Sequence, residues 1–162
     1  MLNNDEKQTQ ACGGKGCKSC GLLFGLDDEI VVNGKNLILD RKLNCKDKSI
    51  VYVAQCTICS KQKQPLNNTL VEDTYFGQTS TELHTRFNDH RNKFKVDTDK
   101  VYEKSALSKH CFDKHPDYMD LNVFKIGIVK QCTPNELDRE ESRFISKFRA
   151  KTSGLNRIKV VR

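Results

Sequence analysis

The 162-residue sequence has no tryptophan and no apolar run long enough to span a membrane. With 7% aromatic residues and a mean hydropathy of −0.65, the chain can bury only a modest core, although its length is ample for one. Its first ten residues, MLNNDEKQTQ, lack the apolar segment of a secretory signal. We therefore expect an intracellular protein without a membrane anchor, whose residues 1–10 form a disordered tail.

Charge and cysteine content narrow the class of protein. Lys and Arg (28) outnumber Asp and Glu (21), which gives a net charge of +7. This surplus favours a polyanionic partner, most simply nucleic acid, although solubility accounts for part of it. Eight cysteines in a chain without a secretory signal indicate metal ligands in a reducing compartment rather than disulfide bonds.

Three cysteines share one glycine-rich segment: Cys12, Cys17 and Cys20. Their spacing is typical of a zinc knuckle, which needs a fourth ligand. The dipeptide Asn33-Gly34 separates two β-rich runs, 29–32 and 36–39, and this pattern predicts a hairpin that returns the chain to the knuckle at Cys45. Free cysteines in a loop are the alternative. We predict a zinc site made of these four thiolates.

A second cysteine pair, Cys56 and Cys59, follows a β-branched and aromatic run over 49–56 that predicts a core strand. The polar segment 61–72 is expected to be a surface loop that leads to a second strand over 74–78. These two strands are expected to pair in antiparallel fashion, as the arms of a long hairpin.

The segment 103–115 predicts a helix that ends at Pro116. It carries His110 and His115, whose spacing after an upstream Cys-x-x-Cys is typical of zinc sites. Residues five apart on an ideal helix diverge by about 140°, so both imidazoles reach one ion only if the helix tightens or ends before the proline. Cys111 is the competing ligand, although we interpret it as a core thiol.

The strand over 74–78 is expected to exit at Gly77 into a long helix. This helix carries Arg86 and His90, and the strand carries Tyr75, so a guanidinium, an imidazole and a phenol can gather around one phosphate. For His90 the alternative is a satisfied core histidine, and for Tyr75 an ordinary strand aromatic.

An alternating run over 122–130 predicts a third strand. The segment 133–136, Thr-Pro-Asn-Glu, then predicts a capping box that opens a last helix, which continues to about Arg149. Glu141 falls within the apolar stripe of this helix, where a carboxylate is costly unless a cation or donors compensate it. We interpret Glu141 as a metal-ligand candidate, and a pairing with arginine is the alternative.

Several motifs fall in the order found in GIY-YIG nucleases: Ile50-Val51-Tyr52, Tyr75-Phe76-Gly77, Arg86, His90, Glu141 and Gly154-Leu155-Asn156. The chain resembles this family over about residues 49–158. Its Cys/His insertion and its cysteine-rich leading segment most resemble the endonuclease domain of Penelope-like retroelements. The resemblance implies an α+β fold with a small three-stranded antiparallel sheet flanked by helices. A zinc-binding module, 11–48, would precede the nuclease domain, 49–162.

The resemblance also assigns roles to residues. Glu141 would bind one Mg²⁺ or Mn²⁺, Tyr52 would help to activate water, and Arg86 would clamp the phosphate. Tyr75, His90 and Asn156 would orient water, metal or leaving group. A tyrosine is a poor base unless a nearby cation lowers its pKa, and Arg86 and the metal are expected to do so.

The function implied is a DNA endonuclease that nicks or cleaves target DNA and so supplies a 3′ hydroxyl for target-primed reverse transcription. It would act in the nucleus, within a larger polyprotein that contains a reverse transcriptase, with two structural zinc ions. The alternatives are a catalytically weak zinc-dependent nucleic-acid-binding module and a cellular structure-specific nuclease of the same family. The basic residues expected to contact DNA phosphates are Lys15, Lys18, Lys61, Lys63, Arg91 and Arg157.

Overall fold

The computed structural model describes residues 10–25, 27–61, 73–95, 105–148 and 155–157. Its centre is an antiparallel sheet in which β3 (Ile50–Cys56) lies between β4 (Thr74–Thr79) and β5 (Phe124–Gln131). The prediction of an α+β fold with three antiparallel strands is confirmed. Every residue of β3 is buried, since this β-branched and aromatic strand is covered on both faces of the sheet.

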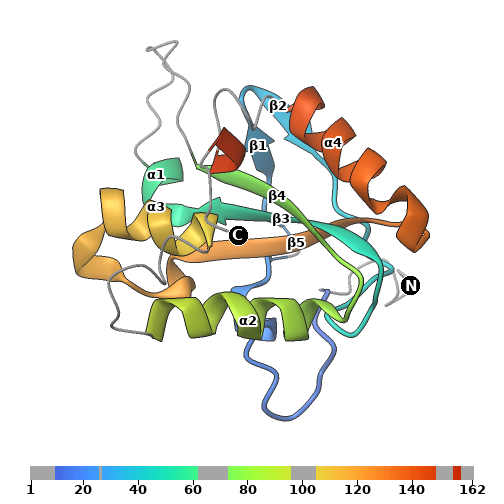
Figure 1. The fold of residues 1–162 in the computed structure, drawn as a ribbon, viewed down its shortest axis with the longest axis horizontal. Helices are drawn as coiled ribbons and strands as arrows, with labels where there is room; N and C mark the ends of the chain where they lie inside the picture. Colours follow the sequence, from blue (N-terminus) through green and yellow to red (C-terminus); the bar gives the residue numbers. More distant parts are fainter. Residues whose placement is uncertain (1–9, 26, 62–72, 96–104, 149–154, 158–162) are drawn as a thin grey trace.

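The two faces of the sheet carry different layers, as Figure 1 shows. Helices α2 (Leu83–Lys95) and α3 (Ala106–Lys114) cover one face, where Phe87 and Leu107 pack in one cluster with Tyr52. Helix α4 (Leu137–Lys147) and a small hairpin cover the other face, where Phe148 packs in one cluster with Val53. The short helix α1 (Thr57–Lys61) continues directly from β3.

The small hairpin confirms the Asn-Gly prediction. Its strands, β1 (Ile30–Val32) and β2 (Lys35–Leu37), are joined by Asn33 at φ 48° and Gly34 at φ 80°, the two positive φ values of a type I′ turn. The turn also reaches the end of α4, because Asn33 Nδ2 donates to the Phe148 carbonyl at 2.6 Å. The hairpin therefore caps the last turn of that helix.

Short 3₁₀ segments connect several elements: Cys20–Leu22, Pro116–Tyr118, Leu121–Val123, Pro134–Glu136 and Leu155–Arg157. The predicted capping box at Thr133 was wrong, since its side chain makes no capping hydrogen bond. Instead the Glu136 amide donates to the Thr133 carbonyl at 2.9 Å, so a 3₁₀ turn precedes α4. Among the described residues, no helix has the length and apolarity that crossing a membrane requires.

The exit predicted at Gly77 was also wrong, because β4 continues to Thr79 and Gly77 stands opposite Tyr52 in the middle of the sheet. A Cβ atom on Gly77 would lie 2.4 Å from Cζ and from Oη of Tyr52. Glycine is thus required here by the tyrosine ring that lies over it, rather than by a turn.

Gln10, which we assigned to a disordered tail, is 1% exposed. Its side chain donates to the carbonyls of Asp40 and Ile128 at 2.7 and 2.9 Å and accepts from the Ile128 amide at 2.8 Å. A parallel bridge between Leu23 and Ile126 joins the same edge of β5. The cysteine-rich segment therefore packs against the sheet, and residues 1–9 lie outside the described range.

Candidate active site and metal clusters

A buried hydrogen-bonded chain connects three elements on the α2 side of the sheet. Tyr52 Oη lies 3.0 Å from His90 Nε2, and His90 Nδ1 lies 2.9 Å from Ser105 Oγ. Burial, and next the charge of Arg86, hold the pKa of His90 well below its usual range. A neutral imidazole satisfies both contacts with one donor and one acceptor nitrogen. His90 thus has the partners of a satisfied core histidine.

The second tyrosine lies beside the first. The ring centroid of Tyr75 is 6.3 Å from that of Tyr52 and 6.5 Å from that of His90. Burial raises the pKa of Tyr75, the Glu141 carboxylate raises it further, and Arg86 opposes both. Glu141 of α4 and Arg86 of α2 are therefore close enough to act on the same phenol. Tyr52, Tyr75 and His90 thus lie together, and Arg86 and Glu141 act on the tyrosines electrostatically.

Tyr52 is a protonated phenol in this environment. Its pKa is raised, first by burial and second by Tyr75, while Arg86 lowers it. The guanidinium acts in the expected direction, but burial outweighs it. As positioned by this chain's own residues, Tyr52 is a hydrogen-bond donor at neutral pH rather than a base.

Arg86 is the best-placed group for an anion. Its Nη1 donates to Asp89 at 3.0 Å, and its buried Nε finds no hydrogen-bond partner in the described part of the chain. A buried donor without a partner is costly, so a ligand that accepts from Nε would be favoured. A phosphate oxygen is such an acceptor, because a guanidinium commonly binds phosphate through two parallel N–H donors.

Asn156 has a different environment. Its Oδ1 accepts from the Phe76 amide at 2.8 Å and its Nδ2 donates to the Phe76 carbonyl at 2.7 Å. The side-chain amide of Asn156 therefore makes both of these hydrogen bonds with the outer edge of β4, next to Tyr75. We interpret Asn156 as a residue that positions this strand, and thereby Tyr75.

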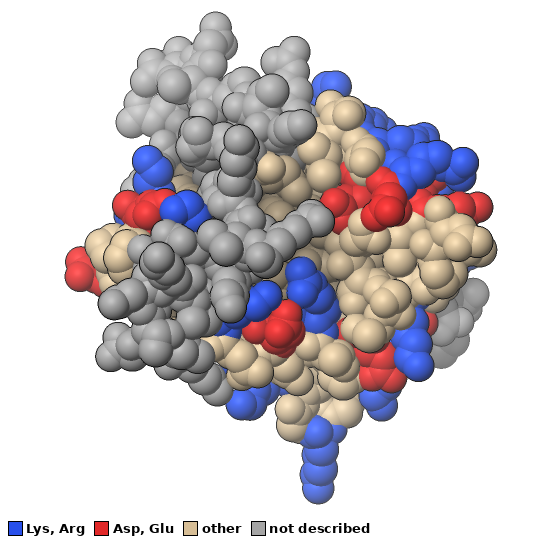
Figure 2. Space-filling model, viewed as in Figure 1, with Lys and Arg blue, Asp and Glu red and all other residues tan. Residues whose placement is uncertain are grey.

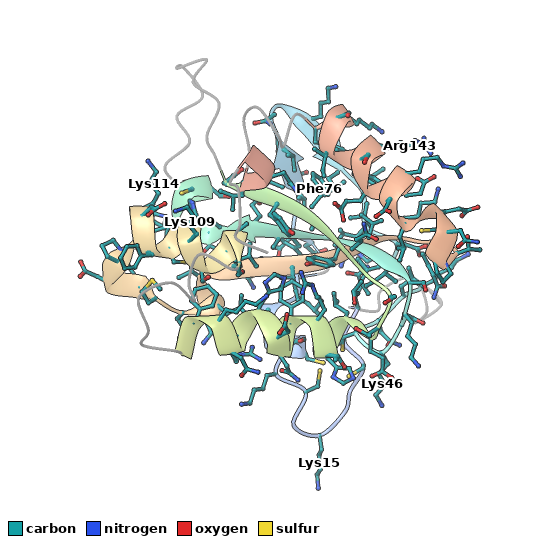
Figure 3. All side chains as sticks on the ribbon, viewed as in Figure 1. Lys15, Lys46, Phe76, Lys109, Lys114 and Arg143 are labelled. Carbon is teal, nitrogen blue, oxygen red and sulfur yellow. The ribbon has the colours of Figure 1, made fainter. Side chains whose placement is uncertain are left out.

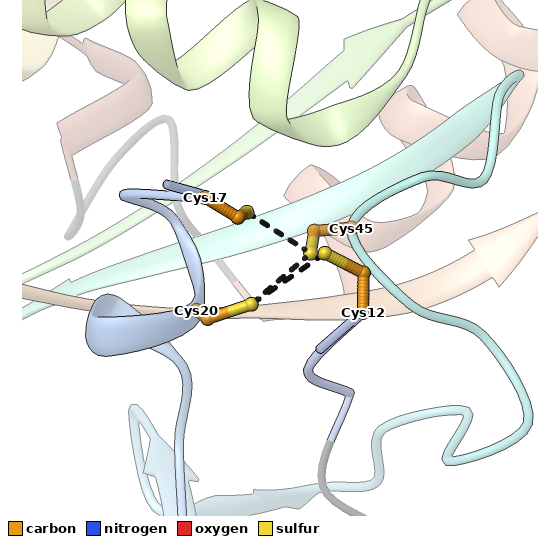
Figure 4. Close-up of side chains that lie close together, drawn as sticks. All are labelled: Cys12, Cys17, Cys20 and Cys45. Carbon is orange, nitrogen blue, oxygen red and sulfur yellow. Dashed lines mark hydrogen bonds between the residues drawn. The ribbon is translucent and has the colours of Figure 1, made fainter. Parts of the chain in front are cut away.

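The four thiols of the leading segment lie together, as Figure 4 shows. Sγ of Cys20 is 3.6 Å from those of Cys12 and Cys45, and Sγ of Cys17 is 3.5 Å from that of Cys45. Sulfur ligands of a tetrahedral zinc ion, each at about 2.3 Å, lie about 3.8 Å from one another. The arrangement fits one ion at the centre of the four sulfurs. Hydrogen bonding from Cys45 lowers the pKa of Cys12 to about 6, whereas burial raises the pKa values of Cys17 and Cys45.

The second cluster joins the end of β3 to α3. Cys59 Sγ lies 3.5 Å from His110 Nε2 and 3.2 Å from His115 Nε2, and Cys56 Sγ lies 3.5 Å from His115 Nε2. Sulfur and nitrogen ligands of one zinc ion lie about 3.6 Å apart. His115 reaches the cluster because α3 ends at Lys114 and His115 leaves the helical backbone at φ −136°, ψ 57°. Both clusters can hold a metal ion.

Cys111 is fully buried, with its pKa raised to about 12, chiefly by burial. It belongs to neither group of convergent ligands. The interpretation of Cys111 as a core thiol agrees with this position.

The first cluster also contacts the helix that carries Arg86 and His90. The His84 amide, in the first turn of α2, donates to the Cys45 carbonyl at 3.0 Å, and Arg91 Nη2 donates to the Lys18 carbonyl at 3.4 Å. The four-cysteine cluster thus holds α2 at two points of its length. Figure 3 shows the loop that carries Lys15 beneath this helix.

The structure describes some of the residues expected to contact DNA. Lys15 and Lys18 are exposed, and Arg91 is half-buried against the Lys18 carbonyl. Lys63 and the side chains of Lys61 and Arg157 lie outside the described parts of the chain.

The sequence analysis did not identify two buried polar residues, Ser105 and Glu140. Ser105 precedes α3 as its N-cap residue, and a serine before a helix is a signal that could have drawn attention to it. Glu140, which carries no such signal, is buried beneath basic side chains on α4. Its partner Lys130 lies on β5, so the contact depends on tertiary structure.

Comparison of the chain with models of known families, with curated proteins and with solved structures finds no match.

Proposed function

We propose that this chain is a metal-dependent DNA endonuclease of the GIY-YIG type. The observation that carries the proposal is the packing of Tyr52, Tyr75 and His90 together. Arg86 and Glu141 act electrostatically on Tyr75, and Arg86 Nε lacks a hydrogen-bond partner in the described part of the chain. Phosphodiester hydrolysis needs a cation on the phosphate and groups that position water. These residues supply that combination in one place.

Each residue has a task that its surroundings support. Arg86, whose side chain is 30% exposed, would bind a non-bridging phosphate oxygen through its guanidinium, and a rearrangement that uncovers Nε would satisfy that unpaired donor as well. Tyr52 would donate a hydrogen bond, held in orientation by His90 and Ser105. Glu141 offers a hard carboxylate oxygen, the ligand that Mg²⁺ or Mn²⁺ prefers, and such an ion supplies Lewis-acid stabilisation of the phosphate when bound.

The two Cys/His clusters would hold structural zinc. Each provides four protein ligands at separations that suit a closed tetrahedral site, and closed sites of this kind stabilise folds rather than catalyse reactions. One ion would hold the leading segment against α2, and the other would join β3 to α3. The DNA partner, the nuclear location and the attachment to a reverse transcriptase remain part of this proposal, on the resemblance alone.

Plasmid nicking tests the proposal. We expect Mg²⁺- or Mn²⁺-dependent conversion of supercoiled plasmid to the nicked form, and a loss of about 10²-fold or more in Arg86→Ala and Glu141→Gln. Glu29→Gln, a change at an exposed carboxylate just before β1, is the matched control and should keep full activity. Equal nicking by folded Glu141→Gln would sink the assignment.

A nucleic-acid-binding module without catalytic power is the second candidate. The complete burial of Tyr52 favours it, since a buried phenol must be uncovered before it meets a substrate. DNA binding without cleavage under every divalent metal would support this candidate. Cleavage confined to branched junctions would instead support a cellular structure-specific nuclease over a retroelement enzyme.

A further inference from the structure

A buried carboxylate of α4 is enclosed by cations. The Glu140 side chain is only 5% exposed, and Lys130 Nζ lies 3.2 Å from its Oε2. Arg143 Nη1 lies 3.1 Å from Oε2, and Arg139 Nε lies 3.9 Å from Oε1. Hydrogen bonding from Lys130 is the main cause that keeps the pKa of Glu140 below its usual value, so the group is ionised at neutral pH.

One carboxylate does not neutralise three cations. The side chains of Lys130, Arg139 and Arg143 remain 43%, 68% and 69% exposed, so their outer surfaces face solvent. Lys147 extends the same surface, and with these three it lines a hollow beside α4. Figure 2 shows Lys and Arg side chains gathered over this helix. Glu136 adds one further negative charge, 3.8 Å from Arg139. Asp138 and Glu141 act elsewhere, on Gln78 and Tyr75, so the described residues that line the hollow carry more cations than carboxylates.

Exposed ion pairs contribute little to the stability of a helix, so stability alone does not account for three cations around one carboxylate. Glu140 instead holds the side chains of Lys130, Arg139 and Arg143 close to one another. Arg143 uses one nitrogen, Nη1, for both carboxylate oxygens, which leaves the remaining donors of its guanidinium directed away from Glu140. A cationic surface whose side chains are already held in place loses less entropy when it binds an anion.

We propose that Lys130, Arg139, Arg143 and Lys147 form a second DNA-contact surface that binds the phosphate backbone of duplex DNA. This inference rests on the proposed function, because the bound DNA would be the duplex that is cut. Glu141 is the next residue after Glu140 and lies about 100° around the helix, so the proposed surface lies beside the residue that would bind the catalytic metal. Arg139 and Arg143 are about 6 Å apart along the helix axis, close to twice the roughly 3.4 Å rise per phosphate of one strand.

The test is the salt dependence of duplex binding, measured by fluorescence anisotropy without divalent ions so that no cleavage occurs. The double variant Arg139→Gln/Arg143→Gln removes two proposed phosphate contacts. Its slope of log affinity against log salt should be shallower than that of the unmodified protein by about two units. Lys147→Gln, which touches none of the Glu140 contacts, should reduce the slope by about one unit.

Lys109→Gln/Lys114→Gln is the matched control, since it removes two charges from α3, far from Arg143 in Figure 3. It should leave the slope within about half a unit of the unmodified value. If the α4 double variant and this control have equal slopes while both remain folded by thermal melting, the inference is overturned. Nicking by the unmodified protein together with equal slopes would refute the α4 surface alone. A slope change without nicking would retain the surface and refute the nuclease.

Discussion

Replacement of Gly77 by alanine tests the packing beneath the active-site tyrosine. The new methyl would lie 2.4 Å from Cζ and Oη of Tyr52 and 2.8 Å from Cε2. Carbon atoms in contact are about 3.5–4.0 Å apart, so the ring must move by about 1 Å or more. Tyr52 is completely buried and packs edge-on against Phe87 at a centroid distance of 5.0 Å, which leaves it little space to move.

The expected cost combines two terms. Overpacking of a filled core costs about 1–3 kcal/mol, and displacing the Tyr52 hydroxyl from His90 leaves a buried group unsatisfied at about 1–3 kcal/mol. Alanine also lowers the conformational entropy of the unfolded chain, which offsets about 0.4–1 kcal/mol of this cost. We therefore expect Gly77→Ala to lower the free energy of unfolding by about 1–6 kcal/mol, a large share of the roughly 5–15 kcal/mol typical of a folded domain.

Urea unfolding followed by circular dichroism measures this change. Gly21→Ala is the control, because no atom lies within 4 Å of its added methyl, and its effect should stay within about 0.5 kcal/mol. In a Tyr52→Leu background, which lacks the three clashing atoms, Gly77→Ala should cost about 1–3 kcal/mol less. Tyr52→Phe keeps Cζ and should not rescue. An equal cost in the tyrosine and leucine backgrounds would refute the reasoning.

Three further predictions concern metal, pH and the edge of the sheet. Cys45→Ser should lose one of two bound metal ions per chain by elemental analysis, whereas Cys111→Ser should keep both. His90 stays neutral in the folded chain, so below about pH 6.5 only the unfolded chain gains its proton. The free energy of unfolding should therefore fall by up to about 1.4 kcal/mol for each pH unit below that value. His90→Gln should flatten this slope in urea titrations. Asn156→Ala leaves both Phe76 backbone groups unpaired and should cost about 1–3 kcal/mol by the same method; an unchanged midpoint would contradict its positioning role.

The strands and the hairpin could be predicted because their signals are local, and the two metal clusters because each is made of cysteines or histidines with a spacing typical of zinc ligands. Alternation and β-branching identified β3 and β5, and the Asn33-Gly34 dipeptide adopts the turn that its chemistry favours. The second cluster needed one geometric condition, an end to α3 before Pro116, and the backbone of His115 meets it. Short-range sequence patterns specify such features without knowledge of the rest of the fold.

The contacts that depend on distant residues could not be predicted. Gln10 lies in a polar segment, and its burial follows only from pairing with β5. Glu140 is covered by Lys130 from another element. At the start of α4, the backbone contact between Glu136 and Thr133 takes the place of the side-chain cap. The raised pKa of Tyr52 likewise depends on burial, whose effect is larger than the lowering by Arg86 that the sequence suggested.

The position of Gln10 bears on the order in which the chain is completed during synthesis. Its partner Ile128 lies 118 residues further along, so at about 5–20 residues per second the ribosome needs about 6–24 s to supply it. During that interval the thiols of Cys12, Cys17 and Cys20 are made but β5 is not. Early metal capture by these thiols would protect them from oxidation, and the leading segment would then dock last onto a sheet that has already formed.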